Sequence, residues 1–330
     1  MDDPEHLDAD ADRVIRLTAP MDAGRLDRWL AGELEQSRSQ LQSWIKAGDV
    51  TVDGQAVRVS HRLEGGERVV VRMPPPPPTT LVAQDIPIEV LYEDAHLMVV
   101  VKPSGLVMHP AKGHPDGTLV NALLHRIQDG GGAPERPGIV HRLDKGTSGT
   151  LVVARDAQTH TGLSEQFAAR TVHRRYLALC WGRLALDQRT VDAPLGRHPT
   201  DRIKFAVVED GKRAITHVVR HQTARPQRTG AGGEVSLVTC RLETGRTHQI
   251  RVHMEHIGHP LVGDPLYGAG RKRPSAWRPL LVGLDHPLLH ASELGFTHPV
   301  TGAEMRFHQP LPDDFQQMLN LLGIETPPVS

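Results

Sequence analysis

The amino-acid sequence predicts an α+β fold, in which helices pack on a mixed, largely antiparallel sheet, preceded by a small separate domain. The strand-like runs after residue 81 are joined mostly by loops and turns and not by regular crossover helices, which favours antiparallel pairing. Five consecutive prolines, 74–78, predict a semi-rigid polyproline II spacer. The chain before this spacer is therefore expected to fold on its own.

These features divide the chain into an acidic disordered tail (1–20), a small domain (21–72), a proline-rich linker (73–80) and a large domain (81–330). With 330 residues, the chain is long enough for one large core and a small additional one. The formal net charge is −1, but residues 1–23 carry −5, so the remainder is mildly basic. The overall balance therefore does not exclude a polyanionic partner.

The sequence contains two cysteines, Cys180 and Cys240, each within an apolar strand-like run. Buried free thiols are expected there, and such thiols fit a reducing compartment. The N-terminal residues are acidic and form no apolar signal-peptide core, and no apolar run reaches transmembrane length. We therefore expect a cytoplasmic protein without membrane contact.

The small domain is predicted to consist of two helices and a hairpin. Apolar side chains recur with helical spacing at 26–34 and again at 39–48, where a glycine ends the second helix. Alternating residues around an Asp-Gly pair predict a hairpin at 50–57, and 67–71 is predicted as a further strand.

The large domain alternates strand-like and helix-like segments irregularly. Strands are predicted at 88–92, 96–103, 176–181, 214–220 and 235–243. Helices are predicted at 117–125, 156–170, 246–257 and 313–322, the second of them capped by Asp156.

One stretch of the large domain, IVHRLDKGTSG at 139–149, has an apolar start and a polar centre, and the apolar run TLVVA follows at 150–154. This pattern predicts a strand, a turn and a second strand. The turn places Asp144 between Arg142 and Lys145, and its glycines allow close approach of a ligand. A carboxylate among cations stays ionised and suits a nucleophile better than a general acid. The same pattern also fits a solvated hairpin tip, so this stretch alone does not decide the function.

Two further runs give this stretch a context. Three runs resemble motifs of the RluA-type pseudouridine synthases and follow one another in the family's order. The first, HRLDKGTSG at 141–149, resembles the catalytic motif. The others are RRYLA at 174–178 and TGRTHQIRVH with its continuation at 244–267. The resemblance extends from about residue 88 to about residue 312. The segment PLGRHP at 194–199 is similar to the RluD-like branch, which modifies large-subunit ribosomal RNA.

The resemblance implies a fold with a catalytic cleft across the sheet. It implies that Asp144 is the nucleophile, and the sequence leaves open whether this residue attacks the sugar or the uracil ring. It further implies that Tyr176 stacks on the flipped uracil and that Arg246 forms an ion pair with Asp144. No cofactor is implied, because pseudouridine formation conserves all atoms. Residue 146 is Gly, where the motif of this branch commonly has Asp.

The small domain, at 24–71, resembles the S-four-type RNA-binding domain. Along one side of it, Arg28, Arg38 and Lys46 are expected to meet RNA phosphates. In the large domain, Arg142 is expected to insert into the RNA stack where the base left.

Basic residues also cluster in predicted loops around the central stretch, and RNA phosphates would meet such clusters. They are Arg170, Arg174 and Arg175, together with basic residues at 197–204, 212–213 and 271–273. The resemblance implies a target in the helix 69 stem-loop of large-subunit (23S) ribosomal RNA, in free RNA or in an assembling subunit. A monomeric enzyme is expected.

Two alternatives come from other functional classes. His253, His256 and His259 recur at a spacing of three residues, which a metal-dependent hydrolase could use, although the pattern is not H-E-x-x-H. A non-catalytic RNA-binding factor in ribosome assembly would share every binding feature, but it would not need to retain Asp144, Tyr176 and Arg246 together.

Overall fold

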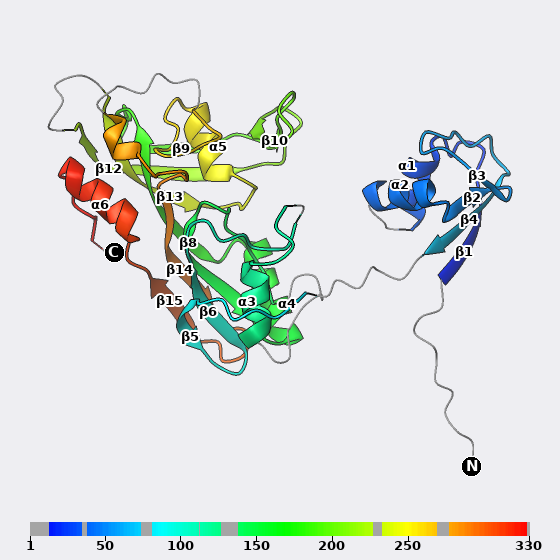
Figure 1. Ribbon diagram of the computed structural model, residues 1–330, viewed down its shortest axis with the longest axis horizontal. Coiled ribbons are helices and arrows are strands. Elements are labelled where there is room, and N and C mark those ends of the chain that lie inside the picture. Colours follow the sequence, from blue (N-terminus) through cyan, green and yellow to red (C-terminus); the bar gives the residue numbers. More distant parts are fainter. Residues whose placement is uncertain are drawn as a thin grey trace, which may run out of the picture. The chain divides into compact units, whose positions relative to one another are not determined.

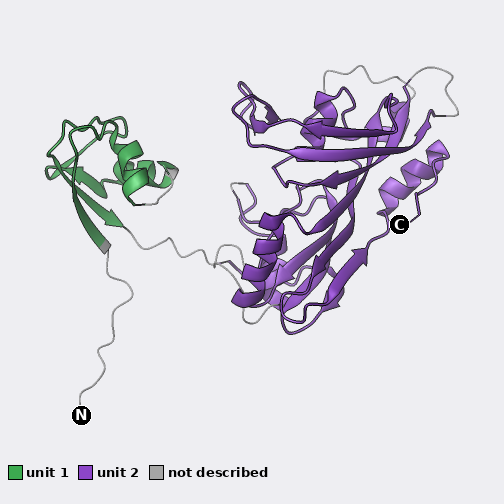
Figure 2. Cartoon of the chain, turned by 180° about the vertical axis from the view of Figure 1, so that it is seen from behind, with its two compact units in different colours: residues 1–80 green, residues 81–330 purple. Residues whose placement is uncertain are grey.

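The chain folds into two compact units, Met1–Thr80 and Leu81–Ser330, which Figure 2 colours separately. The computed structural model describes residues 13–34, 38–73, 81–111, 113–126, 138–226, 233–268 and 277–328. The acidic residues 1–12, the prolines at 74–78 and the basic run at 271–273 lie outside these ranges.

Unit 1 contains the two helices and the hairpin that the sequence predicts, and they pack as one layer of helices on one sheet (Figure 1). Leu30 of the first helix and Leu41 of the second are fully buried against Val69 and Val71 of the last strand. The elements are β1 (Arg13–Thr18), α1 (Leu26–Glu33), α2 (Arg38–Ala47), β2 (Val50–Val52), β3 (Gln55–Ala56) and β4 (Arg68–Met73), with sheet order β1-β4-β2-β3.

The prediction of a disordered tail up to residue 20 is wrong for its last part, because Arg13–Thr18 forms strand β1. Ile15 lies opposite Val71 and Leu17 opposite Val69 in an antiparallel pair with β4. Ile15 and Leu17 alternate with more exposed neighbours, as expected of an edge strand with one face on the core. The acidic residues that precede this short alternation concealed it in the sequence.

Unit 2 is built on a nine-stranded sheet with the order β5-β6-β7-β14-β8-β13-β12-β9, and β15 pairs with β14. Every pairing is antiparallel except that of β7 with β14, which is parallel, so the predicted mixed and largely antiparallel sheet is confirmed. Its strands are β5 (Glu89–Glu93), β6 (Leu97–Lys102), β7 (Ser148–Ala154), β8 (His173–Trp181), β9 (Gln188–Asp192), β12 (Ile215–Ala224), β13 (Val235–Leu242), β14 (Leu289–Thr297) and β15 (Glu304–His308). A separate pair is formed by β10 (Leu195–Arg197) and β11 (Phe205–Val207).

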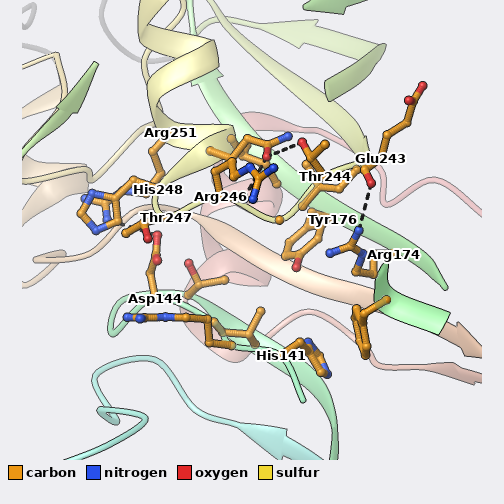
Figure 3. A pocket seen from close by; sticks show the side chains of 18 of the residues that line it. His141, Asp144, Arg174, Tyr176, Glu243, Thr244, Arg246, Thr247, His248 and Arg251 are labelled. Carbon is orange, nitrogen blue, oxygen red and sulfur yellow. Dashed lines mark hydrogen bonds and ion pairs between the residues drawn. The ribbon is translucent and has the colours of Figure 1, made fainter. Parts of the chain in front are cut away.

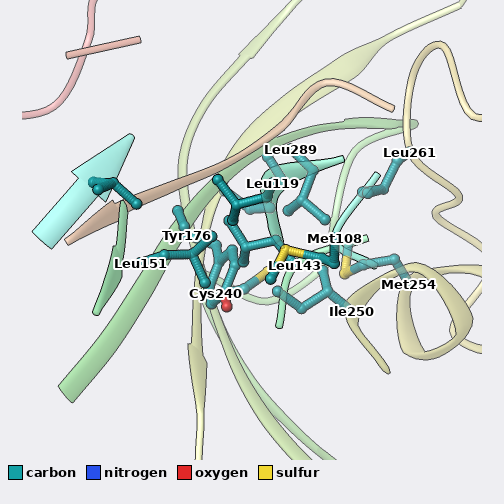
Figure 4. Close-up of a cluster of buried hydrophobic side chains, with 14 of the residues drawn as sticks. Met108, Leu119, Leu143, Leu151, Tyr176, Cys240, Ile250, Met254, Leu261 and Leu289 are labelled. Atoms are coloured by element: carbon teal, nitrogen blue, oxygen red, sulfur yellow. The ribbon is translucent and has the colours of Figure 1, made fainter. Parts of the chain in front are cut away.

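Helices cover both faces of this sheet. On the first face, α3 (Leu119–Arg126) and α5 (Gln249–His256) pack on a core that includes Tyr176 and Cys240 (Figure 4). On the second face, α4 (Ala157–Ala169) contacts β7. Farther along the second face, α6 (Asp313–Leu322) packs on the apolar ends of β8 and β13.

Local sequence signals explain most helix limits in unit 2. Asp156 caps α4 as predicted, because its Oδ1 accepts the Thr159 N–H at 2.7 Å. Helix α6 spans the predicted residues, whereas α5 begins at Gln249 and not at Arg246. A short 3₁₀ turn, Pro279–Leu281, precedes β14.

The two cysteines are free and buried, as the sequence predicts. Burial raises the pKa of the Cys240 thiol well above its usual range, so this side chain behaves as a neutral core residue. Within the described part of the chain, no helix has both the length and the apolar character needed to cross a membrane.

Candidate active site

A cavity of about 480 Å³ opens on the first face of the sheet of unit 2 (Figure 3). The central stretch 139–147 lines one side, the first residues of β8 form part of its floor, and residues 242–251 line the other side. The three segments are the three motif-bearing runs of the sequence, so the fold brings together what is separated by about a hundred residues of chain.

The second strand predicted for the central stretch is confirmed as part of β7, whereas the predicted first strand is wrong. Ile139 forms only an isolated bridge with Val153, and a long irregular segment then leads to β7. The His141 side chain replaces a partner strand, because its Nε2 accepts the Val152 N–H at 3.1 Å. Burial, aided by the nearby Arg174 charge, lowers the pKa of His141 to about 3, which keeps the ring neutral and able to accept this bond.

Buried Lys102 anchors the turn that carries Asp144. Its Nζ donates to the carbonyl oxygens of Pro103, Leu106 and Lys145 at 2.8, 2.8 and 3.0 Å. Burial lowers the pKa of Lys102 to about 7, although the Asp144 charge opposes this shift. The lysine therefore fixes the backbone directly after Asp144.

The residue that pairs with Asp144 is Arg251, whose Nη1 lies 3.4 Å from Asp144 Oδ2. The predicted ion pair between Arg246 and Asp144 is wrong. Arg246 is exposed at the cavity, and its Nε donates to the Arg213 carbonyl oxygen at 3.2 Å. Because α5 begins at Gln249, Arg246 precedes the helix, and Arg251 in the first helical turn reaches the carboxylate instead.

Arg251 is itself held rigidly. Asp264 accepts two hydrogen bonds from the guanidinium, at 2.7 Å from Nε and 2.9 Å from Nη2, and the Tyr267 ring centroid lies 4.9 Å from Cζ. Burial alone would lower the pKa of Arg251, but the hydrogen bonds and charge of Asp264 outweigh burial and raise it. The cation is therefore permanent and aimed at Asp144.

Gln249 fixes the segment before α5. Its Oε1 accepts the Arg246 N–H and the Thr244 hydroxyl, at 3.0 and 2.7 Å, and its Nε2 donates to the Ile215 carbonyl oxygen at 2.9 Å. His248, directly before the helix, adopts a left-handed backbone conformation with φ of 57°. This turn displaces the helix start by three residues from the predicted position.

Tyr176 lies at the cavity beside this ion pair, with 7% of its surface exposed. Burial raises the pKa of its hydroxyl, and the Asp144 charge adds to this effect, while Arg174 opposes it. The phenol therefore remains protonated, and the ring offers a flat apolar wall to a ligand. All three residues that the sequence selects for chemistry, Asp144, Tyr176 and Arg246, thus line one cavity, but the cation that pairs with Asp144 is Arg251.

Comparison with known proteins decides the family. The family model described as RNA pseudouridylate synthase matches residues 96–256, and the S4 domain model matches residues 24–69. The ribosomal large subunit pseudouridine synthase D of Xanthomonas campestris is 48% identical over 306 residues, covering 91% of this chain and 89% of that protein. The chain belongs to the RNA pseudouridylate synthase family.

Other relatives agree with this assignment. The protein of the same name from Pseudomonas aeruginosa is 46% identical, with 94% of this chain and 95% of that protein covered. Among solved structures, Human RNA Pseudouridylate Synthase Domain Containing 1 aligns with a TM-score of 0.54 and 27% identity, covering 69% of this chain and 85% of that one. The chain is therefore an RNA pseudouridine synthase, and the interpretation as a non-catalytic factor is set aside.

In the synthase unit, the predicted RNA-contacting arginines separate. Arg142 is exposed at the edge of the cavity. Arg174 is buried, stacks 5.4 Å from the Phe167 ring centroid, and its Nε finds no acceptor among the described residues. Arg175 points to the second face of the sheet, where it lies 3.7 Å from Glu293. Of these three arginines, Arg142 and Arg174 line the cavity, the first exposed and the second buried.

In the S4 unit, Arg28 and Lys46 are exposed on α1 and α2, where they are available to phosphates. Arg38 has a structural partner, because its Nη2 lies 2.9 Å from Asp27, a carboxylate with no exposed surface. Arg38 is therefore partly committed to the fold of this unit.

Glycines provide room at two positions of the site. A Cβ at Gly146 would approach Pro287 Cδ to 2.9 Å and His286 Cβ to 3.0 Å, so this chain has little space for the Asp that the motif commonly carries. A Cβ at Gly245 would lie 2.8 Å from Arg174 Nη1, so Gly245 leaves room for the buried guanidinium.

The histidine pattern has structural roles. Both ring nitrogens of His253 are used, at 2.9 Å from Thr216 Oγ1 and 3.0 Å from the Ala193 carbonyl oxygen, and His259 Nδ1 lies 2.9 Å from the Trp181 carbonyl oxygen. In the described ranges, no three His, Cys, Asp or Glu side chains form a group that could hold a metal ion.

Sequence reasoning missed Arg251, Asp264 and Lys102. Arg251 lies within the third motif, and Asp264 follows it in the Gly263-Asp-Pro265 turn. The signal that could have identified Arg251 is the direction of helical side chains, which point toward the helix N-terminus. A long arginine side chain in the first helical turn can therefore reach past the helix start. No local pattern indicates that Lys102 is buried, since it ends an apolar strand as surface lysines often do.

Proposed function

We propose that this enzyme converts uridine to pseudouridine in large-subunit (23S) ribosomal RNA, at uridines of the helix 69 loop. Relatives at 46–48% identity are named ribosomal large subunit pseudouridine synthase D, and the segment at 194–199 is similar to the same branch. The single observation that carries the chemistry is the Asp144 carboxylate, paired at 3.4 Å with Arg251 beside the Tyr176 ring.

The reaction breaks the bond from N1 of the base to C1′ of the sugar and forms a bond from C5 to C1′. The hydrogen lost from C5 is balanced by one gained at N1, so no cofactor is consumed. Asp144 provides the nucleophile for either route, toward the sugar or toward the ring. Arg251 keeps the carboxylate in position and balances its charge, and the Tyr176 ring holds the detached base while it turns.

The base must leave the RNA stack before it can enter the cavity. Flipping costs a few kcal/mol and is least costly in a loop, where bases are already partly unstacked. Arg142, exposed at the cavity edge, is placed to fill the space that the base leaves. The unsatisfied Nε of Arg174 offers a donor to a uracil carbonyl or a phosphate.

The S4 unit supplies further phosphate contacts through Arg28 and Lys46. We propose that the enzyme works as a monomer, because residues of one chain complete the cavity. We also propose a cytoplasmic location, which suits its two free thiols. Free RNA and the assembling large subunit are both accessible substrates there.

The test is Asp144→Asn. Asparagine keeps the shape but is no nucleophile, so we expect turnover on a helix 69 stem-loop to fall by about 10³-fold or more, while RNA affinity changes little. The matched control is Asp116→Asn, an exposed acid outside the cavity, which should leave turnover unchanged.

The target is tested in a strain whose only copy carries Asp144→Asn. Sequencing of pseudouridine in ribosomal RNA should reveal loss of the modification in the helix 69 loop. Substantial turnover by the purified variant would rule out the nucleophile, whereas full modification of that loop with loss at another uridine would rule out only the target.

A further inference from the structure

The second face of the sheet in unit 2 has an uncovered region between its two helices. Val152 lies in the cluster under α4, and Leu179 and Leu237 lie in the cluster under α6. On the second face, the part of β8, β13 and β12 between these two apolar clusters belongs to neither of them. A second cavity of about 520 Å³ occupies this region.

The side chains of this region are mostly cationic or titratable. We call it the basic face, defined by His173, Arg175, Arg189, His217, His221, Arg241 and Arg306. The apolar residues among its described lining are Val218 and Val219, and the one carboxylate is Glu293. An antiparallel sheet can expose a polar face to water, but a solvated face normally mixes both signs of charge.

Strand register sets the cations in a row. Arg175 on β8 lies directly opposite Arg241 on β13, Arg241 lies opposite His217 on β12, and His217 lies opposite Thr190 on β9. Neighbouring strands are about 4.8 Å apart, and like charges directly opposite each other are destabilising. The repulsion between Arg175 and Arg241 therefore destabilises the sheet, and a bound anion would reduce it.

Few acids compensate this row. Glu293 is 6% exposed and is already shared by Arg306 at 2.9 Å and Arg175 at 3.7 Å. Glu243 lies 2.7 Å from His217 Nε2 at the edge of the region. Among the described residues no carboxylate pairs with Arg189 or Arg241, and both side chains are exposed.

We propose that the basic face binds the sugar-phosphate backbone of a second segment of the substrate ribosomal RNA, apart from the segment that carries the target uridine. This inference rests on the proposed function. Tyr176 and Arg175 are neighbours on β8 and point to opposite faces, so the base in the catalytic cavity and the phosphates on the basic face belong to different nucleotides, although Arg174 lines both cavities. We therefore assign the basic face to a segment of the RNA that an isolated stem-loop lacks.

The chemistry of the region favours RNA over a protein partner. Protein interfaces concentrate aromatic residues at their centre, and none of the described residues that line the basic face is Phe, Tyr or Trp. Arginines in a row over a polar sheet match the charge of phosphates and carry no base-reading pattern. The contact is therefore expected to depend on salt and not on sequence.

The test is the double variant Arg189→Gln with Arg241→Gln. We expect its affinity for a long fragment of large-subunit ribosomal RNA to fall about tenfold at fixed salt, and the slope of log affinity against log salt to become shallower by about two. Turnover and affinity on the isolated helix 69 stem-loop should stay unchanged. Arg183→Gln, an exposed arginine outside the basic face, is the matched control and should alter none of these values.

Equal affinity of the double variant and the wild type for the long fragment would overturn the proposal, and so would an equal loss on the short stem-loop. The variant Arg189→Lys with Arg241→Lys keeps the charges and should bind the long fragment within about threefold of wild type. If the glutamine pair fails to fold, Arg189→Gln alone, at the exposed edge strand, should lower the salt slope by about one. Wild-type turnover on the short stem-loop reports separately on the proposed function.

Discussion

At the scale of single residues, the site depends on which arginine faces Asp144. Arg251 is 6% exposed in its side chain, pairs with both Asp144 and Asp264, and is stacked on Tyr267. Arg246 is exposed and bonds a backbone carbonyl. A buried, doubly anchored guanidinium loses little entropy when it orients a reacting carboxylate, whereas an exposed one gives weak orientation.

We predict that Arg251→Gln lowers single-turnover isomerisation by about 10²–10³-fold, because it removes the group that positions and balances the Asp144 carboxylate. Arg246→Gln should lower the rate by less than about tenfold. Rates at saturating stem-loop RNA, measured beside the RNA dissociation constants, separate chemistry from binding. A larger effect of Arg246→Gln on the rate would mean that the arrangement of the two arginines changes when RNA binds.

Asp264→Asn tests how firmly Asp264 holds Arg251 against Asp144. The amide keeps one acceptor for Arg251 but loses the charge, so the guanidinium should be less firmly aimed. The sequence could not reveal this arrangement, because it depends on a helix start that is displaced by three residues and on a carboxylate thirteen residues farther along the chain.

At the scale of elements, the sequence predicts most where local signals and tertiary packing agree. Helix α4 has its Asp156 cap and α6 has a clear apolar face, and both lie where they are predicted. Strand β1 was missed, because its alternation follows an acidic run. The residues before Asp144 look like a strand by composition, but the His141 side chain takes the backbone donor that a partner strand would use.

The pairing of α1 with α2 depends on one buried charge. Asp27 has no exposed surface and accepts hydrogen bonds from Arg25, Arg38 and Gln42 at 2.7–3.1 Å. Burial alone would raise the pKa of Asp27, but these three partners outweigh burial and hold the pKa well below its usual 3.8. A carboxyl group whose pKa is depressed in the folded state stabilises the fold at pH values above its pKa in the unfolded state. For Asp27 this contribution is lost as the pH falls below about 3.8.

We predict that Asp27→Asn destabilises unit 1 by about 1–3 kcal/mol at neutral pH, since it leaves the guanidinium groups without their counter-charge. Hydrogen exchange of α1 and α2 amides in the full-length protein measures this directly. The difference between wild type and variant should shrink as the pH falls below about 3.8. A constant difference across that range would show that packing, and not charge, holds the two helices together.

At the scale of the whole molecule, we propose that the two units both contribute to RNA recognition. The described residues that line the cavity belong to the synthase unit, and the S4 unit carries exposed basic residues on its helices and has its own core. A nearly neutral sequence therefore still offers several local basic surfaces, which explains why the formal charge of −1 gave no indication of an RNA substrate.

The last prediction concerns the removal of residues 1–80. Because the described residues that line the cavity all belong to unit 2, we expect the single-turnover rate at saturating stem-loop RNA to stay within about threefold of the full-length rate. The dissociation constant should rise about tenfold or more at physiological salt, with a shallower salt dependence, because the phosphate contacts of Arg28 and Lys46 are lost. The double variant Arg28→Gln with Lys46→Gln in the intact chain should reproduce part of that loss. If the truncated and intact enzymes bind ribosomal RNA equally at matched salt, the S4 unit has another role than holding the substrate.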